Sequence, residues 1–326
     1  MNLRLYDNER NSTLIEKEYP DSFSSNDDGI LEHTTYIDHY FGKGSYKEIY
    51  FEGVHIGFGN TFLRDVIRLD FESDFETIEM HFALKGKSTV TTNALNQSIS
   101  FTPHQHNIIY ANGICGKMQW ESEQFQLCEI NLAPDFFKRY FPQGNRLFDT
   151  FRNAIEKGKS GLLAKSHHPV SHKMYQIVDE IMNCQRQGVF KRMFLEAKVI
   201  ELLLLQLEQF TDDSVLQVSV KKSDVDKIYA VREFILHNLD AACSLIDLAH
   251  QAGTNEFILK KGFKELFGTT VFGFWNDAKM EQAKLLLTEQ GMNVGEVSHY
   301  IGYKNQRHFS AAFKKKFGVL PSQYKK

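Results

Sequence analysis

The first half of the chain changes from a polar stretch to alternating apolar and polar residues. Residues 1–48 are polar and poorly periodic, and no regular element is predicted there. Residues 49–132 hold short runs of aromatic and β-branched residues separated by turn-forming residues. Such runs are typical of β-strands, and several short strands at this spacing indicate a sandwich or a barrel. The pattern therefore predicts a β-rich first domain.

A helical period replaces the alternation near Pro134. Asp135 is expected to cap a short helix there, and two longer helices are predicted over 172–187 and 190–210. The last helix is apolar around much of its circumference, so both of its sides would be buried. One side would pack on its own domain and the other on a second subunit; the alternative is an internal core helix. The side chains assigned to the subunit contact are Ile200, Leu203, Leu204 and Leu207.

Polar and charged residues interrupt the helical pattern over 211–224, and this segment is predicted to be a linker. From residue 225 onward the pattern is helical. The chain is thus divided into a first domain over 1–210, whose helices span about 134–210, the linker over 211–224, and a helical domain over 225–326.

The helical domain contains the same pattern twice. Each copy is a short amphipathic helix, a glycine and a second helix with apolar residues at positions i and i+4, which is the pattern of a helix-turn-helix. Gly253 and Gly302 are expected to adopt the left-handed conformation that ends the first helix of each pair. Asn255 and Asn305 are expected to cap the second helices. One such match is weak, but two basic copies bridged by a helix over 277–287 are much more specific.

The net charge of −3 conceals two regions of opposite sign. Residues 1–215 carry 22 Lys and Arg against 30 Asp and Glu, whereas residues 216–326 carry 16 against 11. Only the C-terminal region is therefore expected to approach a polyanion such as DNA.

Composition excludes several other classes of protein. With 42% apolar and 24% charged residues, the chain of 326 residues has the composition of a globular protein of two or three domains. It has no apolar run long enough to span a bilayer and no signal peptide, and its four scattered cysteines are expected to be free thiols in a reducing cytosol. No common nucleotide-binding or hydrolase signature occurs, so no catalytic residue and no cofactor are predicted.

The end of the chain resembles the DNA-binding domain of AraC/XylS-type transcription regulators. The most specific match runs from Phe309 to Tyr324, with the family pattern F-x-x-x-F-K-x-x-F-G-x-x-P-x-x-Y. The N-terminal half resembles the cupin-like sensor domain of the same regulators, with FTPHQHNIIYA and EINLAPDFFKRYF as the closest stretches. The chain departs from the residues usual in the family at Asn255, Lys261, Lys279, Ser298 and Leu320.

This resemblance implies an α+β fold of two domains. The N-terminal domain would be a cupin-like β-barrel with an α-helical dimerisation segment. The C-terminal domain would be all-α, with two helix-turn-helix motifs joined by a linker helix. The implied function is that of a cytoplasmic, sequence-specific DNA-binding transcription regulator controlled by a small-molecule effector. Its partners would be double-stranded promoter DNA, a second subunit and, for an activator, RNA polymerase.

The exposed residues at the start of each second helix would enter the major groove. Arginine can form two hydrogen bonds to guanine and glutamine two to adenine, whereas contacts to phosphates position a protein without reading the sequence. The alternative is a solvated charged face. The residues expected to read bases are Phe257, Lys260, Lys261, Gln306, Arg307 and Ser310. Those expected to contact phosphates are Lys264, Lys304, Lys314, Lys315 and Lys316.

The sensor domain contains candidate pocket residues. His55, His81 and Trp120 lie on strand-like segments and would line an effector pocket, with core packing as the alternative. A cupin-type metalloenzyme fused to a nucleic-acid-binding domain would instead use His81, His104 and His106 as metal ligands. No glutamate follows the two closely spaced histidines within a few residues, so turn and surface histidines are the simpler interpretation and no metal is predicted. A sensor that binds a partner protein is a third alternative.

Overall fold

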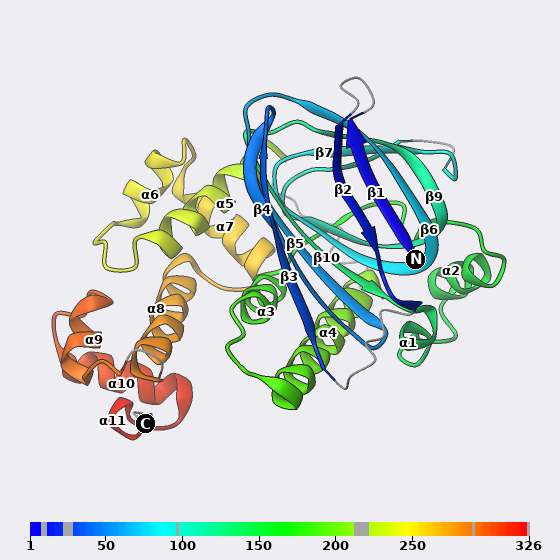
Figure 1. Ribbon diagram of the computed structural model, residues 1–326. Coiled ribbons are helices and arrows are strands. Elements are labelled where there is room, and N and C mark those ends of the chain that lie inside the picture. Colours follow the sequence, from blue (N-terminus) through cyan, green and yellow to red (C-terminus); the bar gives the residue numbers. More distant parts are fainter. Residues whose placement is uncertain (8–11, 22–28, 96–97, 212–221, 289–290, 325–326) are drawn as a thin grey trace. The chain divides into compact units, whose positions relative to one another are not determined.

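The computed structural model describes residues 1–326 apart from residues 8–11, 22–28, 96–97, 212–221, 289–290 and 325–326 (Figure 1). It divides into two compact units, Met1–Gln217 and Val218–Lys326. The first unit is built around a β-sheet, and the second consists of helices. Most of the predicted linker, 211–224, lies outside the described residues.

Unit 1 contains a 12-stranded antiparallel sheet in its described residues. The strands are β1 (Asn2–Asp7), β2 (Ser12–Glu18), β3 (Leu31–His39), β4 (Gly42–Phe51), β5 (Val54–Leu63), β6 (Ile67–Lys85), β7 (Ser88–Thr92), β8 (Ile99–Phe101), β9 (Gln105–Trp120), β10 (Gln124–Leu132), β11 (Gly161–Leu162) and β12 (His168–Pro169). The hydrogen-bonded order is β3-β4-β5-β10-β6-β9-β7-β8. Strand β1 pairs with β2 and β6, and the short β11 and β12 pair with β9.

The strands at the start of the chain correct the prediction of an irregular segment over 1–48. Strand β3 shows why the sequence conceals them. It pairs with β4 over its whole length, yet most of its residues are exposed and polar, so it has no apolar alternation. The later strands are also longer than predicted, since β6 spans 19 residues and β9 spans 16. The lengths of β6 and β9 are set by pairing with strands that lie far away in the sequence, so local patterns do not show them.

Four helices complete the described part of unit 1. They are α1 (Pro134–Lys138), α2 (Arg146–Glu156), α3 (His172–Met182) and α4 (Gly188–Thr211). The prediction lacked α2 and extended α3 to residue 187. It was also wrong about the cap of α1, because Ala133 occupies that position and Asp135 lies inside the first turn. A carboxylate in the first turn still stabilises the helix through its dipole.

Side chains alternate between two faces of the sheet. On one face, here called the helix-covered face, Met80 and Phe82 of β6 are fully buried in the same core as Leu195 and Leu202 of α4. The opposite face, here called the inner face, carries polar side chains of β4, β5, β6 and β10. They are Glu48, His55, Glu79, His81, Glu129 and Asn131. Lys17 and Tyr19 reach over the inner face to Glu48 and His55, because the sheet curls around it (Figure 1).

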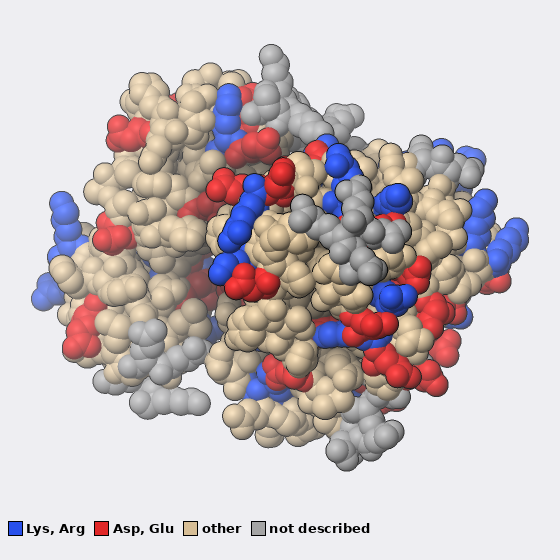
Figure 2. All heavy atoms as spheres, turned by 45° about the horizontal axis from the view of Figure 1, so that its top comes forward, with Lys and Arg blue, Asp and Glu red and all other residues tan. Residues whose placement is uncertain are grey.

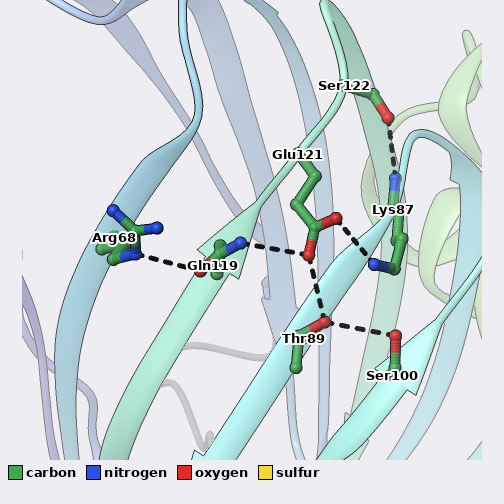
Figure 3. A network of polar contacts seen from close by, with 7 residues as sticks. All are labelled: Arg68, Lys87, Thr89, Ser100, Gln119, Glu121 and Ser122. Carbon is green, nitrogen blue, oxygen red and sulfur yellow. Dashed lines mark hydrogen bonds and ion pairs between the residues drawn. The ribbon is translucent and has the colours of Figure 1, made fainter.

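Polar side chains also connect the strands near one end of the sheet (Figure 3). Glu121, which follows β9, accepts hydrogen bonds from Lys87 Nζ at 2.6 Å and from Gln119 Nε2 at 3.2 Å. Thr89 of β7 donates a longer bond to the same carboxylate, and Arg68 Nε of β6 donates to Gln119 Oε1 at 3.0 Å. This network links β6, β7 and β9 through side chains in addition to their backbone pairing.

Unit 2 contains two helical hairpins and the helix that bridges them. Its described helices are α5 (Lys222–His237), α6 (Leu245–Gln251), α7 (Glu256–Phe267), α8 (Val271–Thr288), α9 (Val294–Tyr300), α10 (Gln306–Phe317) and α11 (Pro321–Tyr324). The pairs α6–α7 and α9–α10 are the two copies of the sequence repeat. Phe263 of α7 and Phe309 and Phe313 of α10 are fully buried. Within the described ranges, no helix combines the length and the apolar character that a bilayer crossing requires.

Gly253 and Gly302 hold equivalent positions but differ in their surroundings, which allows a matched test. Their φ angles are 64° and 78°. A Cβ atom at Gly253 would meet nothing within 4 Å, whereas one at Gly302 would lie 2.7 Å from the Cα of Asp240. Alanine in the left-handed region costs about 1–2 kcal/mol. We expect Gly253→Ala to lower the free energy of unfolding of unit 2 by about that amount, and Gly302→Ala to lower it clearly more.

Denaturant titration measures this difference. In a Trp120→Phe background, the fluorescence of the buried Trp275 reports on unit 2. Equal losses of stability in the two alanine variants would contradict the close approach of Gly302 to the backbone of Asp240.

Candidate nucleic-acid interface and sensor site

Both helical hairpins of unit 2 close their turn in the same way. In the first, the N–H of Thr254 donates to the carbonyl of Ala249 at 2.9 Å, and in the second, the N–H of Tyr303 donates to the carbonyl of Ser298 at 2.9 Å. Each bond spans a glycine of positive φ, as in helices that end at glycine. The small side chains of Ala249 and Ser298 are buried. The two second helices, α7 and α10, are therefore held by equivalent turns.

An asparagine caps each second helix. Asn255 Oδ1 accepts a hydrogen bond from the N–H of Ile258 at 2.9 Å, and Asn305 Oδ1 accepts one from the N–H of Arg307 at 2.8 Å. These bonds satisfy backbone donors that have no partner inside the helix. They fix where α7 and α10 begin and hence which side chains stand at their first turns.

The first helices of the two hairpins also have caps, which the sequence analysis missed. Ser244 and Asp247 form a capping box at α6, and Asn293 and Glu296 form the equivalent box at α9. The signal was present, because a Ser or Asn followed three residues later by an acid is the pattern of such a box. The repeat thus begins at these caps, before the residues by which it was found.

The exposed face of α7 combines cations with an aromatic ring. Phe257 is 73% exposed, and Lys260, Lys261 and Lys264 are exposed beside it. Lys260 forms an ion pair with Glu256 at 2.9 Å within the helix. Lys264 Nζ donates to the carbonyl of Gly268 at 3.1 Å. Lys261 Nζ lies 4.0 Å from Glu265 Oε1, so all three lysines of α7 have partners on their own helix or its end.

The exposed face of α10 is basic, and no Asp or Glu lies within the helix. Gln306 and Arg307 are exposed at its first turn, and Ser310 is half-buried one turn later. Lys314 and Lys315 are exposed at the other end of the helix. Among the described residues, no acid forms an ion pair with Arg307, Lys314 or Lys315. On the face of the molecule drawn in Figure 2, positive and negative side chains are intermingled. Helix α10 differs from this mixed surface, because it contains basic residues and no acidic ones.

Two further lysines predicted at phosphates differ in their placement. Lys304 is exposed in the turn before α10. Lys316 instead packs toward α8, where its Nζ lies 3.0 Å from Asp277 Oδ1 and 3.2 Å from Glu281 Oε1. Lys316 therefore joins α10 to α8, and the structure separates it from the exposed lysines of the same helix.

His55 lies on the inner face of unit 1 in a buried polar network. Its Nε2 is 3.2 Å from Glu48 Oε1, and Asn131 Nδ2 is 3.3 Å from its Nδ1. Glu48 also accepts a hydrogen bond from the hydroxyl of Tyr19 and forms an ion pair with the ammonium of Lys17. Burial is the main cause that lowers the pKa of His55 to about 4, so the imidazole is neutral at pH 7.

His81 lies farther along the same face, next to two carboxylates. Its Nδ1 is 2.7 Å from Glu79 Oε1, and Glu129 of the neighbouring strand stands directly opposite it. Burial, and after it the charge of Glu79, raises the pKa of Glu129. The hydroxyl of Tyr46 donates to Glu129, and Gly57 makes room for this contact, because a Cβ there would lie 2.2 Å from the hydroxyl.

Trp120 does not join these histidines. Its ring stacks on Phe125 at a centroid distance of 4.7 Å, and it packs against an apolar cluster that includes Phe71 and Leu127. The three residues predicted to line one pocket are therefore divided between a polar part, with His55 and His81, and an apolar part, with Trp120.

His104 and His106 were expected to be turn or surface histidines, and the structure places both in buried positions, with His104 in a turn. His104 is buried in a turn with φ of 66°, and its Nδ1 is 2.5 Å from the hydroxyl of Tyr175. His106 is fully buried on the helix-covered face, between Gln206 and Gln209 of α4. His81 lies on the inner face, so these three histidines do not form one group of possible metal ligands in the described part of the chain.

The contacts of His106 connect the sheet with the end of α4. Gln206 Nε2 donates to His106 Nδ1 at 2.9 Å, so His106 Nε2 carries the proton and donates to Gln209 Oε1 at 2.6 Å. Gln209 Nε2 in turn donates to the carbonyl of Pro169 in β12 at 3.0 Å. Burial lowers the pKa of His106 to about 3 and keeps the ring neutral.

The apolar side chains of α4 point in two directions. Leu203 and Leu207 are buried in the core of unit 1, so the prediction that they contact a second subunit was wrong. Ile200 is half-buried, whereas Leu204 is 53% exposed. Farther toward the start of the helix, Met193 is 63% exposed. One exposed apolar stripe of α4 therefore remains, on the side opposite the core.

Two parts of the chain match known protein families. Residues 53–220 match the family described as Regulatory protein PchR N-terminal domain, and residues 248–326 match the family described as Helix-turn-helix domain. The Regulatory protein PchR of Pseudomonas aeruginosa is 30% identical over 128 residues, which are 39% of this chain and 43% of that protein. The Uncharacterized HTH-type transcriptional regulator YidL of Escherichia coli is 34% identical over 103 residues, which are 31% of this chain and 33% of that protein.

One solved structure with similarity is the C-terminal domain of AraT, a response regulator from Geobacillus stearothermophilus. It is 28% identical, covers 30% of this chain and 82% of that chain, and has a TM-score of 0.29. The chain covers less than half of the length of either curated relative. What those whole proteins do is therefore a matter of proposal for this chain.

The buried His106 makes the stability of unit 1 dependent on pH. Its pKa in the folded unit is about 3, against about 6.5 in an unfolded chain. Above pH 6.5 the imidazole of His106 is neutral in both the folded and the unfolded chain. As the pH falls below 6.5, only the unfolded state takes up the proton, so the free energy of unfolding decreases by about 1.4 kcal/mol per pH unit for this group. We expect unit 1 to lose stability between pH 6.5 and pH 5, and His106→Gln to make that slope shallower by about one proton.

Denaturant titrations at several pH values, followed by Trp120 fluorescence in a Trp275→Phe background, measure the slope. The exposed His33 provides the control, since His33→Gln should leave it unchanged. A slope that is the same with and without His106 would disprove the assignment.

Proposed function

The chain belongs to the AraC/XylS-type transcription regulators, with an N-terminal domain of the PchR type, and from this we propose that it binds promoter DNA sequence-specifically under the control of an effector. The observation that supports the proposal best is the pair of equivalent helix-turn-helix hairpins, each with a glycine-ended turn and an asparagine cap. Two second helices held in the same way would enter successive stretches of the major groove, about one turn of DNA apart.

Helix α10 is proposed to dominate recognition. Its first turn presents Gln306 and Arg307, whose side chains can each form two hydrogen bonds to one base, adenine or guanine. Lys314 and Lys315 would neutralise phosphates at its other end. In α7, Phe257 is suited to contact the methyl group of thymine, and its lysines would contribute less, because Lys260 is paired with Glu256.

Unit 1 is proposed to be the cupin-like sensor, and α4 to be the element that responds to it. The inner face would hold the effector, while the other face of the same strands packs on α4. His106, Gln206 and Gln209 join β9 to the last turns of α4, immediately before residues 212–221. An effector can change DNA binding only if it favours one arrangement over another. A shift of β9 relative to α4 would supply such a difference.

The regulator would act in the cytoplasm, where its DNA lies, and would contact RNA polymerase if it activates transcription. A small molecule is the proposed effector class. No observation favours the alternative of a cupin-type metalloenzyme with ligands His81, His104 and His106, because these residues do not form one group of possible ligands in the described part of the chain.

The exposed stripe of α4 is proposed to form a homodimer contact. Phe190 is 72% exposed, and Met193, Ile200 and Leu204 follow it at helical spacing on one side. Apolar residues three and four apart are the pattern that packs two helices together. A dimer would present two copies of unit 2 to one promoter.

The dimer contact can be tested by placing a charge in the stripe. We expect Leu204→Glu to convert a dimer into monomers, since it would bury a carboxylate in an apolar contact. Val66→Glu, at a residue of similar exposure in the turn before β6, should remain dimeric. Sedimentation velocity measures the mass of each variant. A Leu204→Glu protein that is still dimeric would argue against this contact.

The DNA-binding proposal predicts two different defects. Arg307→Ala should cost about 1–3 kcal/mol of binding free energy and relax the preference at one base position.

Lys315→Gln should weaken binding to all sequences alike and reduce the slope of log affinity against log salt by about 0.9. Lys316→Gln is the matched control, because the ion pairs of Lys316 with α8 leave the salt slope unaffected.

The measurement uses DNA selected from a random pool by the unaltered full-length chain, followed by titrations with single-base variants at several salt concentrations. If the selection enriches no sequence, the proposed function fails. If Arg307→Ala retains both affinity and base preference, α10 does not read DNA as proposed.

A further inference from the structure

The inner face of unit 1 brings three potential metal ligands together. Glu79 and His81 lie two residues apart on β6, so their side chains leave the strand on the same face. Glu129 lies directly opposite His81 on β10. One ligand atom from each residue lies within 4.8 Å of the others, and this is the one such group in the part of the chain that the structure describes.

The negative charge of this group is not paired with a lysine or an arginine within the described ranges. Both Glu79 and Glu129 are partly buried, and no lysine or arginine forms an ion pair with either carboxylate among the described residues. Lys17, which reaches over the same face, is paired with Glu48. Two carboxylates so close together repel each other, and a cation bound between them would relieve that repulsion.

His81 identifies the kind of cation. Its ring is held against Phe101 at a centroid distance of 4.2 Å and by Glu79, and its Nε2 is buried without a hydrogen-bond partner among the described residues. A neutral imidazole adds a nitrogen donor to two carboxylate oxygens. Mixed nitrogen and oxygen donors suit divalent first-row metals, with bonds of about 2.0–2.2 Å for zinc. Two donors bonded to one such ion are at most about 4.4 Å apart, so the glutamates would have to rotate slightly to close the site.

The hydrogen bonds made to the possible ligands by surrounding residues also fit a metal site. Tyr46 donates its hydroxyl to Glu129, and Gly57 leaves the space that this bond needs. Carboxylate ligands of metals are commonly oriented by such outer hydrogen bonds. The inner face therefore contains ligands and also the groups that orient them.

We propose that Glu79, His81 and Glu129 bind one divalent first-row metal ion on the inner face of unit 1. This inference rests on the proposed function in one respect, since the inner face is also the face proposed to hold the effector. The set shares only His81 with the metalloenzyme alternative. It uses glutamates from two strands in place of His104 and His106.

The test is a metal titration of the full-length chain after removal of metals with a chelator. Isothermal titration with Zn²⁺ and with Mn²⁺ should give one ion per chain for at least one metal. Glu129→Gln and His81→Gln should each weaken that binding by about ten-fold or more. Glu123→Gln and His33→Gln, which change exposed residues of the same types, should bind as the unaltered chain does. With Co²⁺, the visible absorption that accompanies direct ligation should appear in the controls and be lost in His81→Gln.

Two results would overturn the site: no binding of any of these metals, or binding that the Glu129→Gln and His81→Gln variants retain. Binding of an organic diamine such as putrescine, lost in Glu129→Gln while the metals fail to bind, would also overturn it in favour of an ammonium ligand. Far-UV circular dichroism and Trp120 fluorescence identify a variant that fails to fold, and Glu129→Gln then stands beside His81→Gln as an independent test.

Titration of DNA in the presence of chelator separates this inference from the proposed function. Sequence-specific binding by a chain that takes up no metal would reject the site and keep the regulator. Metal uptake by a chain that selects no DNA would keep the site and reject the regulator.

Discussion

The alternation of side chains along β6 is the constraint on which the rest of unit 1 depends. Met80 and Phe82 enter the core that α4 completes, so Glu79 and His81 must leave the strand on the opposite, inner face. A one-residue slip would exchange the two sets and bury the charges under the helix. For the same reason, a ligand that pulls on the inner face moves strands whose other side touches α4. Under the proposed function, sensing and response would then take place on two sides of one sheet.

Unit 2 depends on local interactions, which are repeated. In each hairpin a positive-φ glycine ends the first helix, and an asparagine two or three residues later begins the second. These contacts span few residues, so each hairpin is determined largely by its own sequence. The bridging helix α8 then fixes the spacing of the two second helices, and Lys316 adds ion pairs between α10 and α8. The separation of two reading elements follows from this rigidity.

Unit 1 is held by contacts between residues far apart in the sequence, and unit 2 by contacts between near neighbours. This difference explains which features the sequence predicted and which it did not. Glycine and asparagine signals act over a few residues, so the turns and caps of unit 2 were visible in the sequence. Glu129 was not visible as a neighbour of His81, because only the pairing of β10 with β6 places them opposite each other. Spacing alone also misled: His104 lies in a left-handed turn, so the two histidines of H-x-H do not share a face as they would in a strand. An apolar helix such as α4 gives no sign of which side faces its own sheet.

Charge sets the remaining condition on DNA binding. The C-terminal region has an excess of only five positive charges, and part of this excess is already used inside the unit, since Lys260 pairs with Glu256 and Lys316 with two acids of α8. Few cations are left to neutralise phosphates, so attraction that is independent of sequence contributes little. Under the proposed function, specific binding would then come from base contacts and from the proposed dimer, whose second unit binds the same DNA at high effective concentration. A regulator of this kind gains an advantage, because weak non-specific binding leaves its occupancy of a promoter sensitive to whatever alters the dimer.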